Sequence, residues 1–419
     1  MSTLSIDPTG ELASFAASLR YDDLPAQVIE MVKRLVLDTL GVSLAATTLG
    51  PGCREVASVM RNRSGVPEST IICHTPKIAA PNAAFVNGAL AHALNFDPIG
   101  SDVGHVGVVC LAAPLAAAES VGGVSGQTFL AACATACEVT ARTTAAVARL
   151  RRSTSGKVLA GQLFGYFGAA AGAGRALGLE PAAMRDALGL ALMQAAGSMQ
   201  VVLDGDPPAK AIYGAFPNQA GVLAALLSQA GLGADCDAVA GTAGLFGMFN
   251  GGAYDTDALI GGLGADFLLM KTQFKLWPTS LHAHPFIAAA AKIFLEDVHP
   301  LEIEAVEVVG PSQLRAWCEP LNKRRRPENA AAAGNSIPFC TAKALINGDV
   351  KLADFTDQGL HDAAAIQVAQ RTVFHPDDRI SGGKVTVSMR DGRSLQACVQ
   401  NPLGDHARPV NDEQLAAKF

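Results

Sequence analysis

Three groups of polar residues interrupt an otherwise apolar sequence, and their side chains are the ones that could carry chemistry. The first group, in NGALAHALNFDPIGSDVGH, contains His92, Asn95, Asp97 and His105. Histidine changes its charge near neutral pH and can therefore transfer protons. Asn and Asp at the end of a helix can face a ligand, but they can equally form turns and caps. From these residues alone the turn interpretation is favoured.

The second group is a single lysine, Lys210, in the Pro/Gly-rich segment GDPPAKAIYGAFPNQAG. A lysine that is removed from water gives up its proton more easily, so it suits proton transfer, and while charged it can hold a carboxylate. An ordinary lysine on a surface loop is the alternative, and this segment alone favours it.

The third group lies in KLWPTSLHAHP and contains Lys275, Ser280, His282 and His284. These residues fall at the junction of the two domains that we predict below, and domain interfaces often hold small-molecule pockets. A site role and a structural role are equally supported for the two histidines.

Several other chemistries have no motif in this chain. The sequence contains no HExxH and no clustered Cys/His set, and only His282 and His284 lie close together, so we expect no metal site. It also lacks a GxSxG nucleophile motif, a phosphate-binding GxxxxGK[ST] loop and a strand followed by GxGxxG. Nucleophilic triads and nucleotide binding are therefore not expected.

Composition and charge favour a cytoplasmic protein that binds neither nucleic acid nor membrane. The net charge is -6, and the nine cysteines form no CxxC pair, which indicates reduced thiols rather than disulfides. Asp7, Pro8 and Glu11 stand where a secretion signal would have a basic start and an apolar stretch. The most apolar window, 106–118, is shorter than the roughly 20 residues that a spanning helix requires.

Helical spacing of apolar residues dominates the first two thirds of the chain. It predicts two amphipathic helices, over 12–19 and 28–36, and alanine-rich helices over 83–93, 127–147, 161–177, 181–196 and 219–230. Paired glycines in 161–177 place small residues on one face, which indicates close contact with neighbouring helices.

Strand signals first appear after residue 271. Apolar and acidic residues alternate over 302–308, and two alternating segments, 384–389 and 394–399, flank the turn Asp391-Gly392. Helical segments at 283–295 and 339–346 lie in the same part of the chain, before and after the first of these segments. We therefore predict two domains: a large all-α helical bundle over 1–271 and a smaller α+β domain over 272–400.

Taken together, these segments resemble the MmgE/PrpD family, which includes 2-methylcitrate dehydratase, cis-aconitate decarboxylase and iminodisuccinate epimerase. The resemblance covers nearly the whole chain, and it rests on the order and spacing of several motifs. They are VLDTLGVSLAA (36–46), AAFVNGALAHALNFD (83–97), FGYFGAAAGAGRALGL (164–179), the Lys210 segment with AGVLAALLSQAG (220–231), KLWPTSLHAHP (275–285), NSIPFCTAKALINGDV (335–350) and DGR (391–393).

The resemblance implies a homodimer whose helical domain is completed by residues 401–419, with a pocket between the two domains. It also implies catalysis without a metal or organic cofactor. By the same resemblance His105, Lys210 and Lys275 fall on active-site positions of the family, and His284 matches a histidine of the motif that begins at Lys275.

Four positions depart from the pattern of the decarboxylase and dehydratase branches. Asn95 stands where an aspartate is usual, Ile99 replaces a threonine and Leu159 replaces a histidine. Ser280 stands where the decarboxylase has histidine. Leucine cannot transfer a proton. Among the reactions of the family, loss of the usual aspartate, threonine and histidine argues most strongly against cis-aconitate decarboxylation.

The reactions of this family share one need, which is to hold the negative charge that develops beside a carboxylate when a proton or carboxyl group leaves. We assign His105 and Lys210 as catalytic residues: His105 as a general base or acid, and Lys210 either as the opposing proton carrier or as a cation that stabilises the enolate-like charge. The expected substrate-binding residues are Asn95, Asp97, Lys275, Ser280, His282 and His284. A dehydratase acting on a small di- or tricarboxylic acid ranks first, followed by an epimerase and by a binding protein that has lost catalysis.

Overall fold

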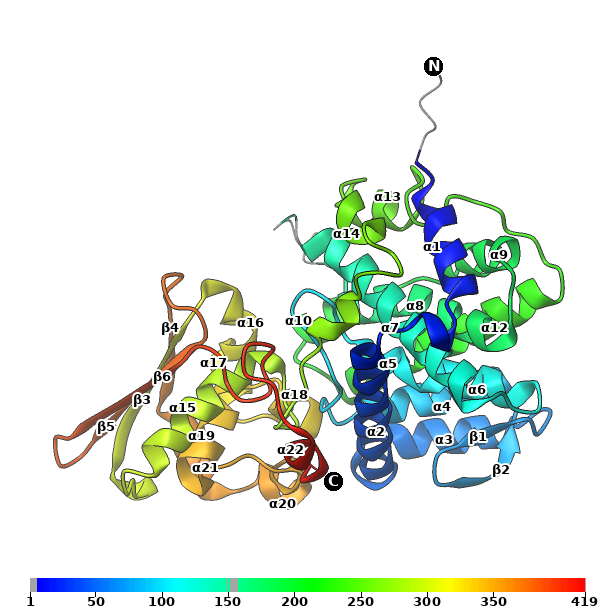
Figure 1. Cartoon of the computed structure of the whole chain (residues 1–419). Coiled ribbons are helices and arrows are strands. Elements are labelled where there is room, and N and C mark those ends of the chain that lie inside the picture. The colour runs from blue at the N-terminus through cyan, green and yellow to red at the C-terminus, as the bar shows by residue number, and fades with distance from the viewer. Residues whose placement is uncertain (1–5, 149, 151–156, 419) are drawn as a thin grey trace. The chain divides into compact units, whose positions relative to one another are not determined.

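The computed structural model describes residues 6–148, 150 and 157–418 (Figure 1). Its contacts divide the chain into two compact units. The helical unit comprises the described residues up to Ala93, then Asp97–Gln200 and Ile212–Gln273. The second unit comprises Leu94–Phe96, Val201–Ala211 and the described residues from Phe274 onward.

Long alanine-rich helices make up most of the helical unit, as the apolar spacing predicts (Figure 1). Alanine favours helix because it loses no side-chain entropy there. The helices are α1 Pro8–Ser18, α2 Ala26–Leu49, α3 Cys53–Arg61, α4 Ala80–His92, α5 Val106–Cys110, α6 Ala112–Ser120, α7 Gly126–Ala148, α8 Ala160–Leu177, α9 Pro181–Leu192, α12 Ala215–Gln229, α13 Leu245–Asn250 and α14 Thr256–Ile260.

Glycines let α8 pack closely against its neighbours in the core of this unit. A Cβ atom at Gly168 would collide with Thr140 on α7, and a Cβ at Gly221 of α12 would lie 2.6 Å from the Cβ of Ala169 on α8. Such close approach confirms the helix contacts that the small-residue spacing predicts, and it makes α8 the central helix of the unit.

A buried ion pair attaches the end of the helical unit to α7. The Glu138 carboxylate accepts hydrogen bonds from the backbone N–H groups of Leu268 and Leu269, and Arg142 donates to it at 2.7 Å. Arg142 also donates to three backbone carbonyls, those of Leu259, Gly261 and Asp266. The segment that leads to the unit boundary is therefore held by side chains of α7.

The helical unit is not entirely α-helical, which corrects the all-α prediction. The short strands β1 Ser69–Ile71 and β2 His74–Ile78 pair antiparallel. The connection includes Cys73, whose φ of 62° lies in the left-handed region. Strands of three and five residues are too short to produce a clear alternating pattern.

The second unit is an α+β structure built on a four-stranded sheet with the order β4-β3-β5-β6. β3 Ile303–Gly310 pairs parallel with β4 Thr372–Pro376 and antiparallel with β5 Gly383–Met389, which forms a hairpin with β6 Ser394–Val399. The sheet and the hairpin at Asp391-Gly392 confirm the predicted strands.

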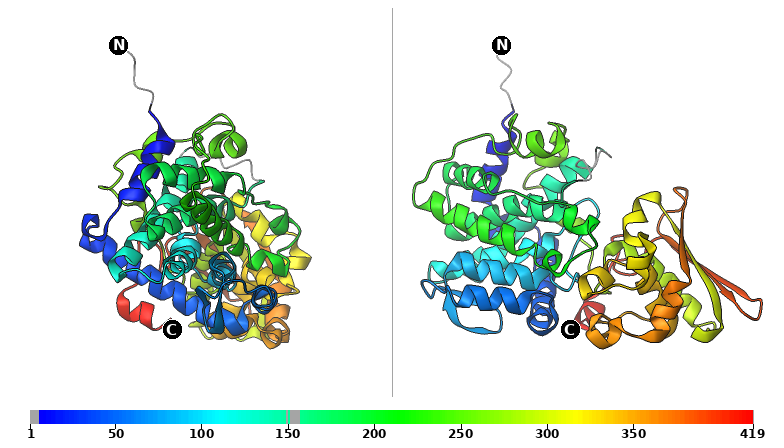
Figure 2. Two further views of the ribbon diagram at one scale, coloured as in Figure 1. Left: turned by 90° about the vertical axis from the view of Figure 1, so that its right-hand side faces the viewer. Right: turned by 180° about the vertical axis from the view of Figure 1, so that it is seen from behind.

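Helices cover one face of this sheet (Figure 1, and seen from behind in Figure 2). Apolar side chains of α15 and α19 form the core with the buried residues of the strands. The helices of this unit are α11 Pro208–Ala211, α15 His284–Phe294, α16 Arg315–Cys318, α17 Leu321–Arg325, α18 Ala330–Gly334, α19 Ile337–Asn347, α20 Asp357–Leu360, α21 Ala363–Gln370 and α22 Asp412–Ala416, and most of α10 Gln200–Leu203 also belongs here.

The contacts differ from the predicted domain limits at two places. The boundary falls after Gln273 rather than at 271, and residues 401–418 group with the second unit rather than with the helical unit. The reason for the second difference is local, because Lys418 donates to the backbone carbonyl of Phe96 at 2.9 Å and lies over the Phe96 ring. Short segments from the first half of the chain, 94–96 and 201–211, also join the second unit.

Among the described residues no helix has the length and apolar character that crossing a membrane would need. The nine cysteines are all free thiols in the structure, and six of them are buried.

Candidate active site

Two imidazoles share one buried carboxylate in the helical unit. His92 is the last residue of α4, and His105 immediately precedes α5. Asp97, in the loop between them, is fully buried. One of its oxygens lies 3.0 Å from His92 Nδ1, and the other lies 2.7 Å from His105 Nδ1. We call these three residues the His-Asp-His cluster.

The carboxylate determines how the two rings are protonated. An ionised carboxylate only accepts hydrogen bonds, so both Nδ1 atoms must carry the hydrogen. With the hydrogen on Nδ1, the basic atom of a neutral His105 is Nε2. His92 is 1% exposed, whereas the His105 side chain is 21% exposed, so His105 is the member that a ligand can reach.

Tyr213 packs against both imidazoles, and sequence reasoning did not identify it. Its ring centre lies 4.0 Å from that of His92 and 5.8 Å from that of His105. Burial, together with the nearby Asp97 charge, raises the pKa of Tyr213 well above its ordinary value. The phenol therefore stays protonated. Its position three residues after Lys210 was the one signal in the sequence that pointed to it.

A glycine at the start of α8 lets this helix meet the cluster. A Cβ at Gly161 would lie 2.6 Å from the Tyr213 hydroxyl and 2.8 Å from Cδ2 of His105. Leu159, at the position where the resemblance implies a histidine, is only two residues away and is the N-cap of α8.

The fold brings together a possible set of metal ligands that the sequence spacing did not indicate, because His92, Asp97 and His105 contribute one ligand atom each within 4.8 Å of one another. The N–O separations of 2.7 and 3.0 Å are those of ordinary hydrogen bonds. With bonds near 2.0 Å, neighbouring ligand atoms around a tetrahedral zinc ion would lie roughly 3.3 Å apart. The present geometry is that of a hydrogen-bonded cluster.

In the second unit, Lys275 is held by the loop residue Asn95. The ammonium is 1% exposed and donates to the backbone carbonyl of Asn95 at 2.9 Å and to its side-chain oxygen at 2.8 Å. Asn95 has a φ of 51°, a left-handed conformation that Asn tolerates better than most residues. Both oxygens of Asn95 thereby point to one lysine.

His284 lies buried near Lys275 as a neutral imidazole. Burial, followed by the positive charge of Lys275, lowers its pKa from 6.5 to about 3. Its ring hydrogen-bonds to the backbone of Trp277, while the buried Nε2 atom has no hydrogen-bond partner among the described residues. A buried polar atom without a partner is costly, and it suggests a position that a ligand or water can satisfy.

The other predicted residues of the second unit are in different surroundings. Lys210 is 8% exposed on the short helix α11, so it is not the surface lysine of the alternative interpretation. Ser280 is also 8% exposed, and its backbone N–H donates to the carbonyl of Gly334 at 2.7 Å. His282 is exposed and packs against Trp317, with ring centres 4.2 Å apart.

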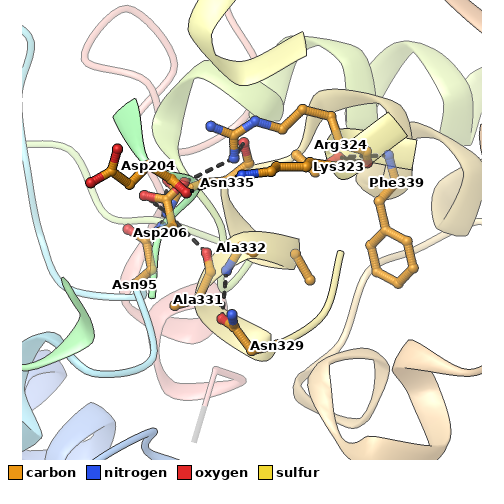
Figure 3. Close-up of polar contacts among 12 residues, drawn as sticks. Asn95, Asp204, Asp206, Lys323, Arg324, Asn329, Ala331, Ala332, Asn335 and Phe339 are labelled. Atoms are coloured by element: carbon orange, nitrogen blue, oxygen red, sulfur yellow. Dashed lines mark hydrogen bonds and ion pairs between the residues drawn. The ribbon is translucent and has the colours of Figure 1, made fainter. Parts of the chain in front are cut away.

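A buried polar network near Asn95 also escaped sequence reasoning (Figure 3). Asp206 forms an ion pair with Arg324 at 2.8 Å and accepts a hydrogen bond from Asn335 at 3.4 Å. Asn95 in turn donates to Asn335 at 3.4 Å. Asp206 and Arg324 are 118 positions apart in the sequence, so no spacing motif connects them.

Comparison with models of protein families identifies the family of this chain. The model of the MmgE/PrpD N-terminal domain matches residues 10–256, and that of the MmgE/PrpD C-terminal domain matches residues 277–419. The chain belongs to the MmgE/PrpD family. This result confirms the resemblance stated from the motifs, and the two matched ranges meet near the boundary between the two units.

Among curated proteins, the similar ones are cis-aconitate decarboxylases and a related protein of this MmgE/PrpD family. The cis-aconitate decarboxylase-like protein oryM of Aspergillus oryzae is 25% identical over 98% of this chain and 89% of its own length. Cis-aconitate decarboxylase of Aspergillus terreus is 25% identical over 98% and 88%, and that of Homo sapiens is 24% identical over 98% and 86%.

Proposed function

We propose that the protein takes a proton from the carbon beside a carboxylate of a small di- or tricarboxylic acid, with His105 as the proton carrier. The observation that carries this proposal is the His-Asp-His cluster. Asp97 orients the partly exposed imidazole and stabilises its positive charge after it has accepted a proton. A general acid or base of this kind contributes about 10²–10⁴-fold to a rate. In this proposal Asp97 orients His105 instead of binding substrate.

Cationic side chains stabilise the charge that this step creates. When the α-proton leaves, negative charge develops on the adjacent carboxylate, and fixed positive charges lower the energy of that state. We assign this role to Lys275, whose ammonium is held by two oxygens of Asn95. Lys210 serves as the second proton carrier, as the family resemblance implies. No metal or organic cofactor takes part in these steps.

Among the possible reactions we favour loss of water from a hydroxy acid. The relatives named above are cis-aconitate decarboxylases and one decarboxylase-like protein. By the family resemblance, however, Asn95, Ile99 and Leu159 stand at positions where the decarboxylase branch has other side chains. The buried Nε2 atom of neutral His284 would accept a hydrogen bond from a substrate hydroxyl while Lys275 pairs with a carboxylate. A lyase of the dehydratase type is therefore our proposal.

The experiment incubates the purified protein with a panel of hydroxy di- and tricarboxylic acids and with cis-aconitate. Absorbance of a new carbon–carbon double bond from a hydroxy acid is the expected result, and it requires Lys210, so the Lys210→Ala variant gives none. Release of carbon dioxide from cis-aconitate would replace the dehydratase by a decarboxylase. Inversion of a stereocentre without a new double bond would establish an epimerase. A panel member that raises the melting temperature without being converted would favour a binding protein.

A further inference from the structure

A continuous set of polar contacts in the second unit runs from Lys275 to Asp206, and Figure 3 shows its part from Asn95 to Arg324. Lys275 donates to Asn95, Asn95 donates to Asn335, and Asn335 donates to Asp206. Asp206 then pairs with Arg324, whose guanidinium also donates to the backbone carbonyl of Asn335 at 3.2 Å.

The backbone is unusual at two members of this network. Only four non-glycine residues of the described chain have a positive φ, and Asn95 at 51° and Asp206 at 58° are two of them. Left-handed backbone is unfavourable for residues with a Cβ, and it persists where surrounding contacts impose it. Two such positions in one hydrogen-bonded network indicate that the network determines the loop conformations rather than following from them.

The charges of the network are also unusual. The side chains of Asp206 and Arg324 are 0% and 5% exposed. Burial raises the pKa of Asp206 above its ordinary value, and the positive charges of Lys210 and Arg324 oppose that rise. Asp206 is therefore a carboxylate with two cations near it. Buried ion pairs seldom add net stability over apolar residues of the same size, so stability alone does not account for this pair.

We infer that Asp206 is a positioning residue of the proposed reaction, which holds the Lys210 ammonium by its charge and supports the Asn95 clamp on Lys275 through Asn335. Arg324 fixes the Asp206 carboxylate and balances its charge. This inference rests on the proposed function for its kinetic consequence. The electrostatic contact between Asp206 and Lys210 can be tested without any substrate.

Two further parts of the second unit bear on the design of a test. Helix α18, which packs against α11, has the sequence AAAAG and carries no charge. Asp204 precedes Asp206 by two residues and is exposed, and Lys323 donates to its backbone carbonyl at 3.4 Å. Asp206 is thus the carboxylate to change, and Asp204 offers a matched control nearby.

The kinetic test compares Asp206→Asn, the double variant Asp206→Asn/Arg324→Met and Asp204→Asn. Asp206→Asn should lower kcat at least tenfold and lower the melting temperature, because it leaves Arg324 buried without its carboxylate. The double variant removes both charges, so its melting temperature should return toward that of the wild type while kcat stays low. Asp204→Asn should match the wild type in both. Recovery of kcat in the double variant, or unchanged kcat in Asp206→Asn, would show that the pair is only structural.

A second test follows how fast acetic anhydride labels Lys210 at different pH values, measured by mass spectrometry of its peptide. The Asp206 carboxylate stabilises the ammonium form, so its removal should shift the half-maximal reactivity of Lys210 to lower pH by about one unit. An unchanged midpoint overturns the inference even in a protein that converts no acid. If the wild type converts no acid but the midpoint still shifts in the variant, the proposed function is wrong. The electrostatic interaction between Asp206 and Lys210 is then still supported.

Discussion

At the scale of single residues, each candidate side chain has a specific partner that determines its protonation. Asp97 places hydrogens on the Nδ1 atoms of His92 and His105. Asn95 holds Lys275 without adding a negative charge of its own. His284 is neutral because burial and Lys275 both oppose its protonation. Of the two imidazoles that share Asp97, His105 is the one that is partly exposed.

The neutral state of His284 predicts a loss of stability in acid. The unfolded chain takes up a proton on this histidine near pH 6.5, whereas the folded protein resists protonation down to about pH 3. Unfolding therefore binds a proton between these values, and stability falls as the pH is lowered from 6.5, by roughly 1.4 kcal/mol for each pH unit. Urea unfolding at pH 6.5, 5.5 and 4.5 measures this slope.

The His284→Gln variant cannot take up the proton, so its free energy of unfolding should depend less on pH over this range. The control is His361→Gln, since the His361 side chain is 71% exposed. That control should keep the slope of the wild type. Equal slopes in His284→Gln and the wild type would mean that His284 is protonated in the folded protein.

Only part of the candidate site could be predicted from the sequence at this scale. His105, Lys210 and Lys275 were named because short motifs around them resemble a family. Tyr213 and Asp206 lie in the same segment as Lys210 but were not singled out, and Arg324 lies in none of the motifs. Their importance comes from contacts that short segments do not reveal. Asp206 meets Arg324 across 118 positions, and a pattern within a window of the sequence cannot indicate that contact.

At the scale of elements, the first turn of α8 approaches His105 closely. Gly161 is the second residue of this helix, and the space where its Cβ would stand is filled by Tyr213 and His105. Alanine favours helix over glycine by about 1 kcal/mol, so Gly161 is not explained by helix stability. We infer that close approach is the reason for glycine here.

The Gly161→Ala variant should therefore displace the His105 ring and reduce turnover, by on the order of 10²-fold, because small misplacements of catalytic groups are costly. Its far-ultraviolet circular dichroism should stay that of the wild type. The matched control is Gly126→Ala at the start of α7, where a Cβ would meet nothing within 4 Å. Equal turnover in the two variants would mean that the approach of α8 does not position His105.

The elements themselves were largely predictable, because alanine-rich helices and the hairpin at Asp391-Gly392 have strong local signals. The first and last residues of the helices and strands were less predictable. The helix expected from residue 219 begins at Ala215, and the strands β1 and β2 were not foreseen. Both strands are held by pairing with each other, and a strand of three residues has no periodicity to detect.

At the scale of the whole molecule, the sequence pattern changes from helical spacing to strand alternation near the boundary between the two units. The change at residue 271 lies close to the boundary after Gln273. What the sequence could not indicate is that Leu94–Phe96 and Val201–Ala211 belong with the second unit. Because these two short segments group with the second unit, Asn95 and Lys210 share a unit with Lys275, while His105 belongs to the helical unit.

The central claim is that His105 moves a proton between solvent and the carbon beside a substrate carboxylate. The most direct measurement is proton nuclear magnetic resonance of the best-bound acid in deuterated water, with wild type, His105→Asn and the control His361→Gln. We predict deuterium at that carbon with wild type and His361→Gln, and a rate about 10²–10⁴-fold lower with His105→Asn. Equal exchange by His105→Asn and wild type, or no exchange by wild type with any acid that it binds, would contradict the account.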